Sequence, residues 1–184
     1  FVASPYAVEQ LVSARCLSCK TFDEFSMVDF TVDGADELDP HVRMFKGGGG
    51  AQLRVKIVAS SSLYMACIAD QSKMVNHLGA FPLPIEVSRF GITTTAGKIE
   101  RLLAKLGYTD AKMRIRAIGE TEMPFITDSG NPILDLKLGK ITDAERLDVE
   151  LQMMPGVVET GLFIGICGLL MVGMNDGVRE FSKP

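Results

Sequence analysis

Residues 27–37 read MVDFTVDGADE, a run rich in β-forming side chains that ends in an Asp-Gly turn signal. The run predicts a strand that stops at Asp33-Gly34. The apolar run 63–69, LYMACIA, has the length of a strand buried on both faces of a parallel sheet. Four apolar side chains after the glycines at 47–50 suit a helix: Ala51, Leu53, Ile57 and Val58. This alternation of strands and helices through residue 79 predicts an α/β unit.

A second pattern begins near Pro82. Five short apolar runs predict strands, at 83–87, 113–118, 124–127, 133–138 and 157–160. An apolar stripe from Ile99 predicts a helix capped by Gly107, and Thr142 and Glu145 fit a capping box that starts another. The order β-α-β-β-β-α-β indicates a compact α+β module with an antiparallel sheet. Two more buried strands are expected to return to the first unit, at 162–166 and 169–172.

Composition and charge narrow the possible functions. The 184 residues carry 19 Lys+Arg and 23 Asp+Glu, a net charge of −4, so nothing electrostatic points to a nucleic-acid partner. The longest uncharged stretch, 160–175, is too short and too rich in glycine to span a bilayer. Four cysteines without an export signal fit the reducing cytoplasm. We expect a soluble cytoplasmic protein with no nucleic-acid or membrane partner.

Two motifs are candidates for a binding site. The carboxylates of DGADE, residues 33–37, follow a strand, where α/β sheets place their ligands, although a solvated turn also explains them. Lys46 and the glycines at 47–50 precede a helix, so their backbone amides can approach an anion closely. The spacing matches neither a P-loop nor a dinucleotide-binding motif. A flexible connector is the alternative, but four glycines cost backbone entropy, and we favour a ligand loop.

The remaining reactive side chains do not form a recognisable site. Cys16 and Cys19 have metal-site spacing but no second pair, and Cys67 and Cys167 lie in apolar runs typical of a core. The two histidines stand apart. We therefore predict no metal and no cysteine catalysis. Residues 6–14 carry a weak amphipathic pattern, and the chain opens at Phe1 without Met, so we expect the natural N-terminus to lie further upstream.

Together, the motifs resemble those of the A-type ribose-5-phosphate isomerases. They are DGADE at 33–37, KGGGGA at 46–51, ADQSK at 69–73, FPLPIEV at 81–87, TDSGN at 127–131 and PGVVETGLF at 155–163. The resemblance implies an α/β, Rossmann-like parallel-sheet domain at 1–81 and 162–184 and a smaller ferredoxin-like α+β domain at 82–161. It implies a cofactor-free homodimer or homotetramer that interconverts ribose 5-phosphate and ribulose 5-phosphate in the pentose phosphate pathway.

The resemblance also implies roles for particular residues. Isomerisation through an enediolate needs proton-transfer groups and positive charge near C1 and C2 of the sugar. Asp33 and Asp36 are expected to contact the sugar, with Asp33 handling a proton, and Lys46 to stabilise the enediolate. Lys73 is expected near the phosphate, assisted by Ser72. The backbone around these side chains completes the expected substrate site, at Gly34, Ala35, Gly47, Gly48 and Gly49.

Two features depart from the family pattern. The family's opening βα unit, with its Gly-Thr-Gly-Ser-Thr-like phosphate loop, does not occur in this sequence, and we expect a longer natural chain. Val55 stands where the family has the glutamate that abstracts the proton, so we predict poor activity. An inactivated protein, an altered sequence and rescue by Asp33, Asp36 or Glu37 all remain open. The alternative functions are a non-catalytic sugar-phosphate sensor and an amino-sugar-phosphate deaminase.

Overall fold

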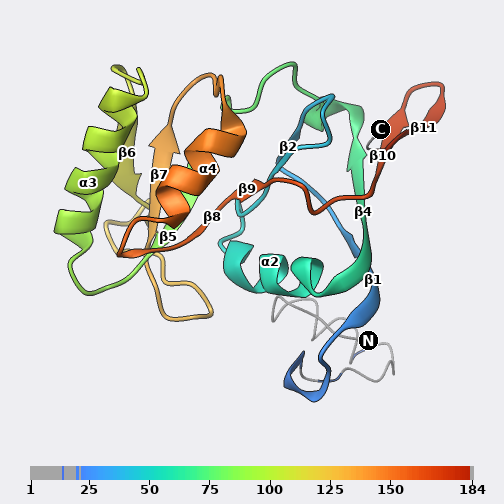
Figure 1. Ribbon diagram of the computed structural model, residues 1–184, viewed down its shortest axis with the longest axis horizontal. Coiled ribbons are helices and arrows are strands. Elements are labelled where there is room, and N and C mark those ends of the chain that lie inside the picture. The colour runs from blue at the N-terminus through green and yellow to red at the C-terminus, as the bar shows by residue number, and fades with distance from the viewer. Residues whose placement is uncertain (1–13, 15–19, 21, 183–184) are drawn as a thin grey trace.

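The computed structural model describes residues 14, 20 and 22–182 (Figure 1). The helical segments are η1 (Phe22–Glu24), α2 (Gln52–Ser60), η2 (Gln71–Lys73), α3 (Ile92–Lys105) and α4 (Ala144–Gln152). The strands are β1 (Val28–Asp33), β2 (Glu37–Leu38), β3 (Met44–Phe45), β4 (Ser62–Asp70), β5 (Leu83–Val87), β6 (Lys112–Ile115), β7 (Ile133–Lys137), β8 (Val157–Thr160), β9 (Leu162–Phe163), β10 (Leu169–Met174) and β11 (Gly177–Ser182). The predicted helix at 6–14 and the Cys16/Cys19 pair lie outside the described residues.

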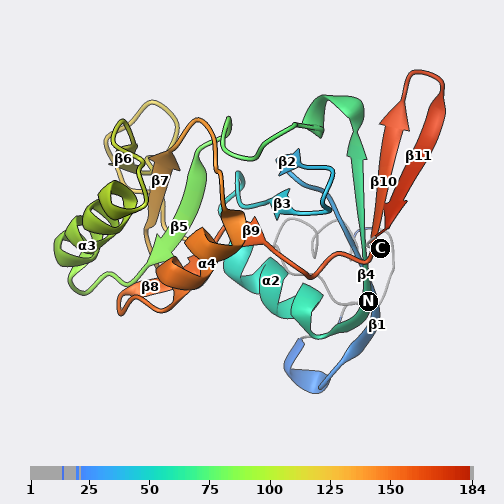
Figure 2. The ribbon, with the colours of Figure 1, turned by 45° about the horizontal axis from the view of Figure 1, so that its top comes forward.

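The first sheet has the strand order β1-β4-β10-β11. Strands β1, β4 and β10 run parallel, as the sequence predicts for an α/β unit, and β11 returns antiparallel to β10. Helix α2 contacts β1 and β4 on one side and β8 on the other (Figure 2). The end of β1 is fixed by its register, in which Asp33 lies opposite Cys67 of β4.

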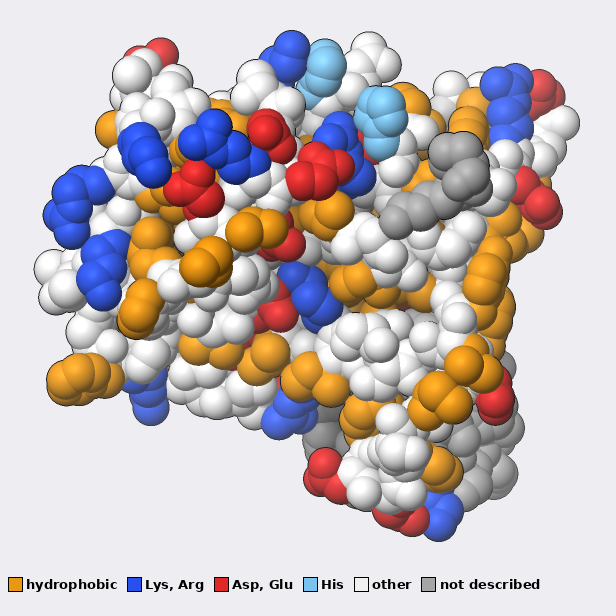
Figure 3. All heavy atoms as spheres, viewed as in Figure 1, with side chains coloured by type: hydrophobic (Ala, Val, Ile, Leu, Met, Phe, Trp, Pro, Cys, Tyr) orange, Lys and Arg blue, Asp and Glu red, His pale blue; other side chains and the backbone are white. Residues whose placement is uncertain are grey.

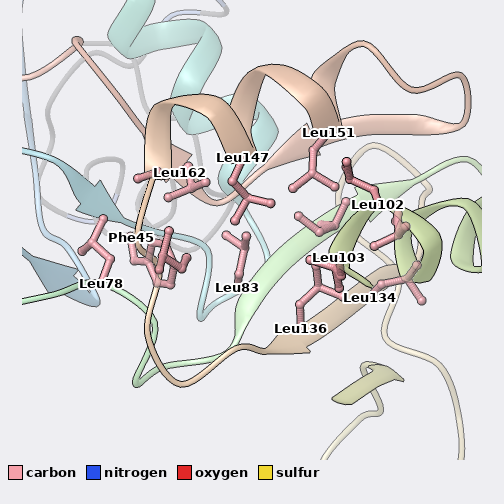
Figure 4. Packing of buried hydrophobic residues seen from close by; sticks show 14 of the residues in the cluster. Phe45, Leu78, Leu83, Leu102, Leu103, Leu134, Leu136, Leu147, Leu151 and Leu162 are labelled. Atoms are coloured by element: carbon pink, nitrogen blue, oxygen red, sulfur yellow. The ribbon is translucent and has the colours of Figure 1, made fainter. Parts of the chain in front are cut away.

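The smaller module, called the small domain below, consists of β5, α3, β6, β7, α4 and β8 in this order, with their connecting loops. Its sheet is antiparallel with the strand order β6-β7-β5-β8, the arrangement of a ferredoxin-like fold. Figure 4 shows how leucines from both helices pack on this sheet. The same core continues into the first unit through Phe45, Leu78 and Leu162, which are at most 1% exposed. The predicted division into residues 1–81 with 162–184 and residues 82–161 stays a prediction.

Three short strands, β2, β3 and β9, form a sheet between these two units (Figure 2). Phe45 of β3 lies opposite Glu37 of β2 and opposite Leu162 of β9. The run 162–166 returns to the first unit as expected, but only Leu162–Phe163 is a strand, and it pairs with β3. The run 169–172 joins the parallel sheet as part of β10. The segment ending in β9 turns aside because Gly161 is hydrogen-bonded to the Lys46 amide, 2.9 Å, and to Pro84, 2.8 Å.

Four other expectations need correction. The run 63–69 is not buried on both faces, since Leu63 and Ile68 of β4 are 64% and 53% exposed. Figure 3 shows hydrophobic side chains at the surface on the right of the molecule, where β4 and β10 lie in Figure 1. Residues 124–127 form only isolated bridges, because Pro124 lacks the amide donor that a ladder needs. Helix α4 is capped by Asp143 and not by the expected box of Thr142 and Glu145. The Asp143 side chain accepts a 3.0 Å hydrogen bond from the Arg146 amide. β11 was not anticipated.

Among the described residues, no helix combines the length and the apolar character needed to cross a bilayer. The described residues also contain no cluster of three or more histidine, cysteine, aspartate or glutamate side chains arranged to hold a metal ion. Cys67 and Cys167 are at most 1% exposed and form part of the core that the sequence predicts for them.

Candidate functional site

A pocket of about 310 Å³ opens where β1 ends and α2 begins. Its wall combines the turn after β1, the glycine loop (residues 46–50) and the first turns of α2. The lining residues are Asp33, Gly34, Ala35, Asp36, Lys46, Gly47, Gly48, Gly49, Ala51, Gln52 and Val55. The pocket thus lies at the carboxyl end of a parallel strand, where open α/β sheets bind ligands.

Lys46 provides the positive charge of the pocket. Its ammonium lies 2.8 Å from Asp33 Oδ2 and also donates a hydrogen bond to the Gly34 carbonyl. The Lys46 side chain is only 7% exposed, and its Nζ lies 5.5 Å from the centroid of the buried Phe163 ring. A cation above an aromatic face gains electrostatic stabilisation, so the ammonium is held at one place in the wall.

The glycine loop turns tightly beside this cation. Gly47 and Gly50 have φ values of +108° and +82°, which side chains other than glycine rarely adopt. The Gly48 amide donates a 2.7 Å hydrogen bond to Asp36 Oδ2. A Cβ atom on Gly48 would stand 2.8 Å from Asp36 Oδ1, so only glycine permits this approach. The loop and the acidic turn are therefore built around each other.

Helix α2 contributes Gln52 and Val55, one turn apart on its buried face. Of the apolar side chains that predict this helix, Ile57 is 45% exposed, whereas Gln52, Val55 and Ala59 are buried. The Gln52 side chain is unusual because neither Nε2 nor Oε1 has a hydrogen-bond partner among the residues that the structure describes. Each such buried, unpartnered polar group is costly, by about 1–3 kcal/mol.

The pocket brings together almost all the side chains and glycines that the sequence singles out. Asp33, Asp36, Lys46 and Val55 all line it, as do the expected backbone positions. Ser72 and Lys73 do not line this pocket, and they lie in η2, directly after β4. There Asp70 caps the short helix, accepting a 2.8 Å hydrogen bond from the Ser72 amide. The catalytic and binding roles assigned to all these residues remain predictions.

Sequence reasoning missed the residues that support the pocket from a distance. Arg116 contacts the glycine loop from the small domain, and Phe163 lies beneath Lys46. Arg116 belongs to no quoted motif, and although Phe163 ends the motif PGVVETGLF, its contact with Lys46 joins segments far apart in the chain. Gln52 gives one signal, a polar side chain two residues after the last glycine of the loop. It is read correctly only once the buried face of α2 is known.

Cysteine chemistry is disfavoured at this site. Cys67 lies under the pocket, opposite Asp33 in the sheet register. Burial raises the pKa of the Cys67 thiol to about 12, and the neighbouring Cys167 adds to the effect. The thiol therefore stays protonated near neutral pH and is a poor nucleophile. The chemistry available in the pocket is that of two carboxylates, one ammonium and a set of backbone amides.

Such a set of groups suits a polar, negatively charged ligand. The ammonium and the amides can stabilise an oxyanion, and the carboxylates can accept hydrogen bonds from hydroxyl groups or exchange protons with them. No nucleotide motif lies in the wall, and the volume fits a small molecule. A phosphorylated sugar combines the hydroxyl groups and the negative charge that this wall can bind.

Comparison with known proteins gives a consistent result. The ribose 5-phosphate isomerase A (phosphoriboisomerase A) family matches residues 1–177. Ribose-5-phosphate isomerase A of Sinorhizobium fredii is 52% identical over 163 residues, covering 89% of this chain and 69% of that protein. The protein of the same name from Rhodopseudomonas palustris strain HaA2 is 48% identical over 170 residues, covering 92% of this chain and 72% of its own length.

Solved structures agree with the sequence relatives. Ribose 5-phosphate isomerase A from Methanocaldococcus jannaschii superposes with a TM-score of 0.85 at 33% identity, covering 99% of this chain and 77% of that one. A D-ribose-5-phosphate isomerase in complex with phospho-erythronic acid superposes with a TM-score of 0.87 at 31% identity, covering 98% and 76%. The match spans nearly all of this chain in sequence and in fold, and the chain belongs to the ribose 5-phosphate isomerase A family.

Proposed function

We propose that this protein is a sugar-phosphate isomerase that interconverts D-ribose 5-phosphate and D-ribulose 5-phosphate through an enediolate in the pentose phosphate pathway. The observation that carries the proposal is the wall of the pocket. One buried ammonium, Lys46, two carboxylates and the glycine-loop amides surround a cavity large enough for a pentose phosphate. Family membership supports the same reaction.

Each polar group has a task in this reaction. As a base removes the C2 proton of the aldose, negative charge develops on the carbonyl oxygen. Lys46 and the loop amides stabilise this charge. Asp33, paired with Lys46 at 2.8 Å, exchanges the hydroxyl proton between the two oxygens. Asp36 binds the sugar from the opposite side of the loop, where the Gly48 amide orients its carboxylate at 2.7 Å. Lys73 contacts the phosphate.

Val55 is the weak point of this machinery. Its isopropyl group lines the pocket at the position where the family resemblance expects a glutamate base, and a hydrocarbon cannot accept a proton. General bases typically contribute about 10²–10⁴ in rate, so we expect slow turnover supported only by the aspartates. The same observation favours a second candidate, a protein that binds the sugar phosphate without turning it over.

Proton exchange with solvent distinguishes these two candidates. The protein is incubated with D-ribose 5-phosphate in D2O, and the ¹H NMR spectrum is followed over time. An isomerase produces ribulose 5-phosphate that carries deuterium at C1, whereas a sensor shows binding without a new product. Ammonia release from glucosamine 6-phosphate would instead identify a deaminase. The absence of both binding and turnover would contradict the proposal.

We also propose that the protein works in the cytoplasm as a homodimer or homotetramer. The buried free thiol of Cys67 and the metabolic relatives support the location. Phe90 and Met153 of the small domain are 93% and 79% exposed, and large exposed apolar side chains favour an interface. Their segments adjoin, since the Ser88 amide donates to the Gly156 carbonyl at 2.8 Å. Sedimentation of the purified protein measures the assembly directly.

A further inference from the structure

Arg116 of the small domain, which directly follows β6, is hydrogen-bonded to the glycine loop. Arg116 Nη1 donates hydrogen bonds to the carbonyls of Gly47, 2.8 Å, and Gly48, 3.0 Å. The rest of the guanidinium forms a two-pronged pair with Asp135 of β7, with Nη2–Oδ1 2.6 Å and Nε–Oδ2 3.1 Å. The two side chains are only 12% and 7% exposed. The guanidinium is therefore fixed before it meets the loop.

These contacts determine which way the loop amides point. The Gly47 carbonyl shares a peptide unit with the Gly48 N–H, and the Gly48 carbonyl shares one with the Gly49 N–H. In a trans peptide, the C=O and N–H point in opposite directions, and the described residues contain no cis peptide. A guanidinium on the two carbonyls thus directs both N–H groups away from Arg116. It also polarises them, because hydrogen bonds to charged donors are the strong ones.

The two amides differ in what they meet. The Gly48 N–H already donates to Asp36 Oδ2 at 2.7 Å. It binds this carboxylate in the way that a loop amide would bind an anionic ligand. The Gly49 N–H has no hydrogen-bond partner within the part of the chain that the structure describes, although Gly49 lines the pocket. A Cβ atom on Gly49 would meet nothing within 4 Å. Gly49 is thus exposed and borders the pocket, and its unpaired amide is accessible to a ligand.

A second contact holds the loop in the same place. The Phe125 amide donates to the Arg116 carbonyl at 2.8 Å, so the two residues are neighbours on adjacent segments. A Cβ atom on Gly50 would overlap the Phe125 ring, which shows how closely the ring packs on the loop. Arg116 and Phe125 thus both contact the glycine loop from the small domain, one by hydrogen bonds and the other by packing.

We propose that Arg116 is a positioning residue of the isomerase site: by fixing the Gly47 and Gly48 carbonyls, it holds the Gly48 amide on Asp36 and directs the Gly49 amide to the negative charge of the enediolate. This inference rests on the proposed function and extends it to the small domain. The effect of Arg116 is selective for charge at the reacting carbons, because the phosphate end of the substrate does not depend on these two amides.

Calorimetry with two ligands tests this selectivity. Phospho-erythronic acid carries a carboxylate whose charge resembles that of the enediolate, whereas D-ribose 5-phosphate has the phosphate without the carboxylate. We expect Arg116→Met to weaken the binding of phospho-erythronic acid by about tenfold or more. Loss of a whole oxyanion donor typically lowers kcat by ~10²–10³, and a misdirected donor should lose part of that stabilisation. Affinity for ribose 5-phosphate should change by less than about threefold.

Arg54→Met is the matched control. Arg54 also bridges α2 to the small domain, donating to the Asp128 carbonyl at 2.7 Å, but it does not touch the loop carbonyls. We expect this variant to bind both ligands as the parent does. Equal losses for both ligands in Arg116→Met, or no loss beyond that of Arg54→Met, would overturn the proposed role. A parent protein that binds neither ligand would overturn the proposed function as well.

Two further measurements remain decisive if Arg116→Met fails to fold. The double variant Arg116→Met/Asp135→Leu replaces the buried ion pair by apolar side chains and leaves no lone buried carboxylate, a change that is often nearly neutral for stability. It should show the same selective loss. In the unaltered protein, NMR should show the Gly49 amide proton moving downfield when phospho-erythronic acid binds and much less with ribose 5-phosphate. A Gly49 resonance that does not respond contradicts the proposal without any variant.

Discussion

Lys46 Nζ lies 2.8 Å from Asp33 Oδ2, with the cation buried deeper than the anion. The lysine side chain is 7% exposed and the aspartate side chain 36%. A ligand entering the pocket therefore meets Asp33 before it reaches the ammonium. Because Phe163 and the Gly34 carbonyl hold the ammonium from behind, its charge remains directed at the cavity. The pair places a proton-exchanging group beside the charge that stabilises an oxyanion.

Removal of this ammonium should abolish selective anion binding. We expect Lys46→Met to weaken the binding of phospho-erythronic acid by on the order of 10²-fold, because Lys46 is the one cation among the described residues that line the pocket. Lys105→Met, at a lysine that is 69% exposed and 3.7 Å from Glu150, should bind as the parent does. Calorimetric titration measures both. Retention of parent-like affinity by Lys46→Met would remove Lys46 from the site.

The Gln52 amide should lower the stability of the protein. Replacement by leucine, which has a similar volume, removes two buried polar atoms that have no partner in the described part of the chain. We expect Gln52→Leu to raise the free energy of unfolding by about 1–3 kcal/mol. Thermal and urea melts of parent and variant provide the measurement. Gln71→Leu, at an exposed position of η2, serves as the control and should change little.

The outcome at Gln52 separates two structural states. A stabilised Gln52→Leu variant means that the amide is unpaired in the ligand-free protein. A loss of stability of about 1 kcal/mol or more would mean that the amide has a partner, such as an ordered water, and would contradict the expectation.

A polar network beside α2 should make stability depend on pH. Thr160 Oγ1 donates to Asp148, and Lys56 Nζ lies 2.5 Å from Glu159 Oε1 in the same network. Burial raises the pKa of the Asp148 carboxyl above its ordinary 3.8, against the lowering effects of Thr160 and Lys56. The native state then holds a proton that the unfolded chain releases. The contribution of Asp148 to the free energy of unfolding therefore decreases as the pH rises from 3.8 through the raised pKa.

Comparison of Asp148→Asn with the parent reveals this contribution. The variant should gain melting temperature relative to the parent as the pH rises above 3.8 and then reach a plateau. Glu150→Gln gives the opposite control. The hydrogen bond from Arg146 lowers the pKa of Glu150 below 4.5, so its contribution is present at neutral pH and lost on acidification. A difference between Asp148→Asn and the parent that is constant with pH would contradict the assignment.

Local signals in the sequence were enough for much of the fold. The Asp-Gly turn after residue 32 marks the end of β1, and Gly107, with a φ of +89°, marks the end of α3. Periodicity predicts helix α3 because the apolar stripe that starts at Ile99 faces a single sheet. The apolar side chains after the glycines also predict helix α2, but they do not mark its buried face, because α2 packs on two units at once, with Ile57 exposed and Gln52 buried.

Long-range contacts explain what the sequence did not reveal. Arg116 lies about 70 positions after Gly47, to which it donates, and no motif relates the two. The Glu145 side chain was expected to complete a capping box, but it lies 2.9 Å from Arg43, 102 residues away. The pocket itself was predictable because DGADE and the glycines are brought together by short segments within one unit. Its supporting contacts depend on how the small domain docks.

The central claim is that this pocket isomerises a pentose phosphate and is limited by the side chain at position 55. Turnover of D-ribose 5-phosphate should be compared in the parent, Val55→Glu and Val55→Gln. The two variants differ little in size, and only one has a basic carboxylate. We predict that Val55→Glu exceeds Val55→Gln by about 10²–10⁴ in kcat. Equal turnover in the two variants, with the parent-like affinity for phospho-erythronic acid retained, would contradict the account.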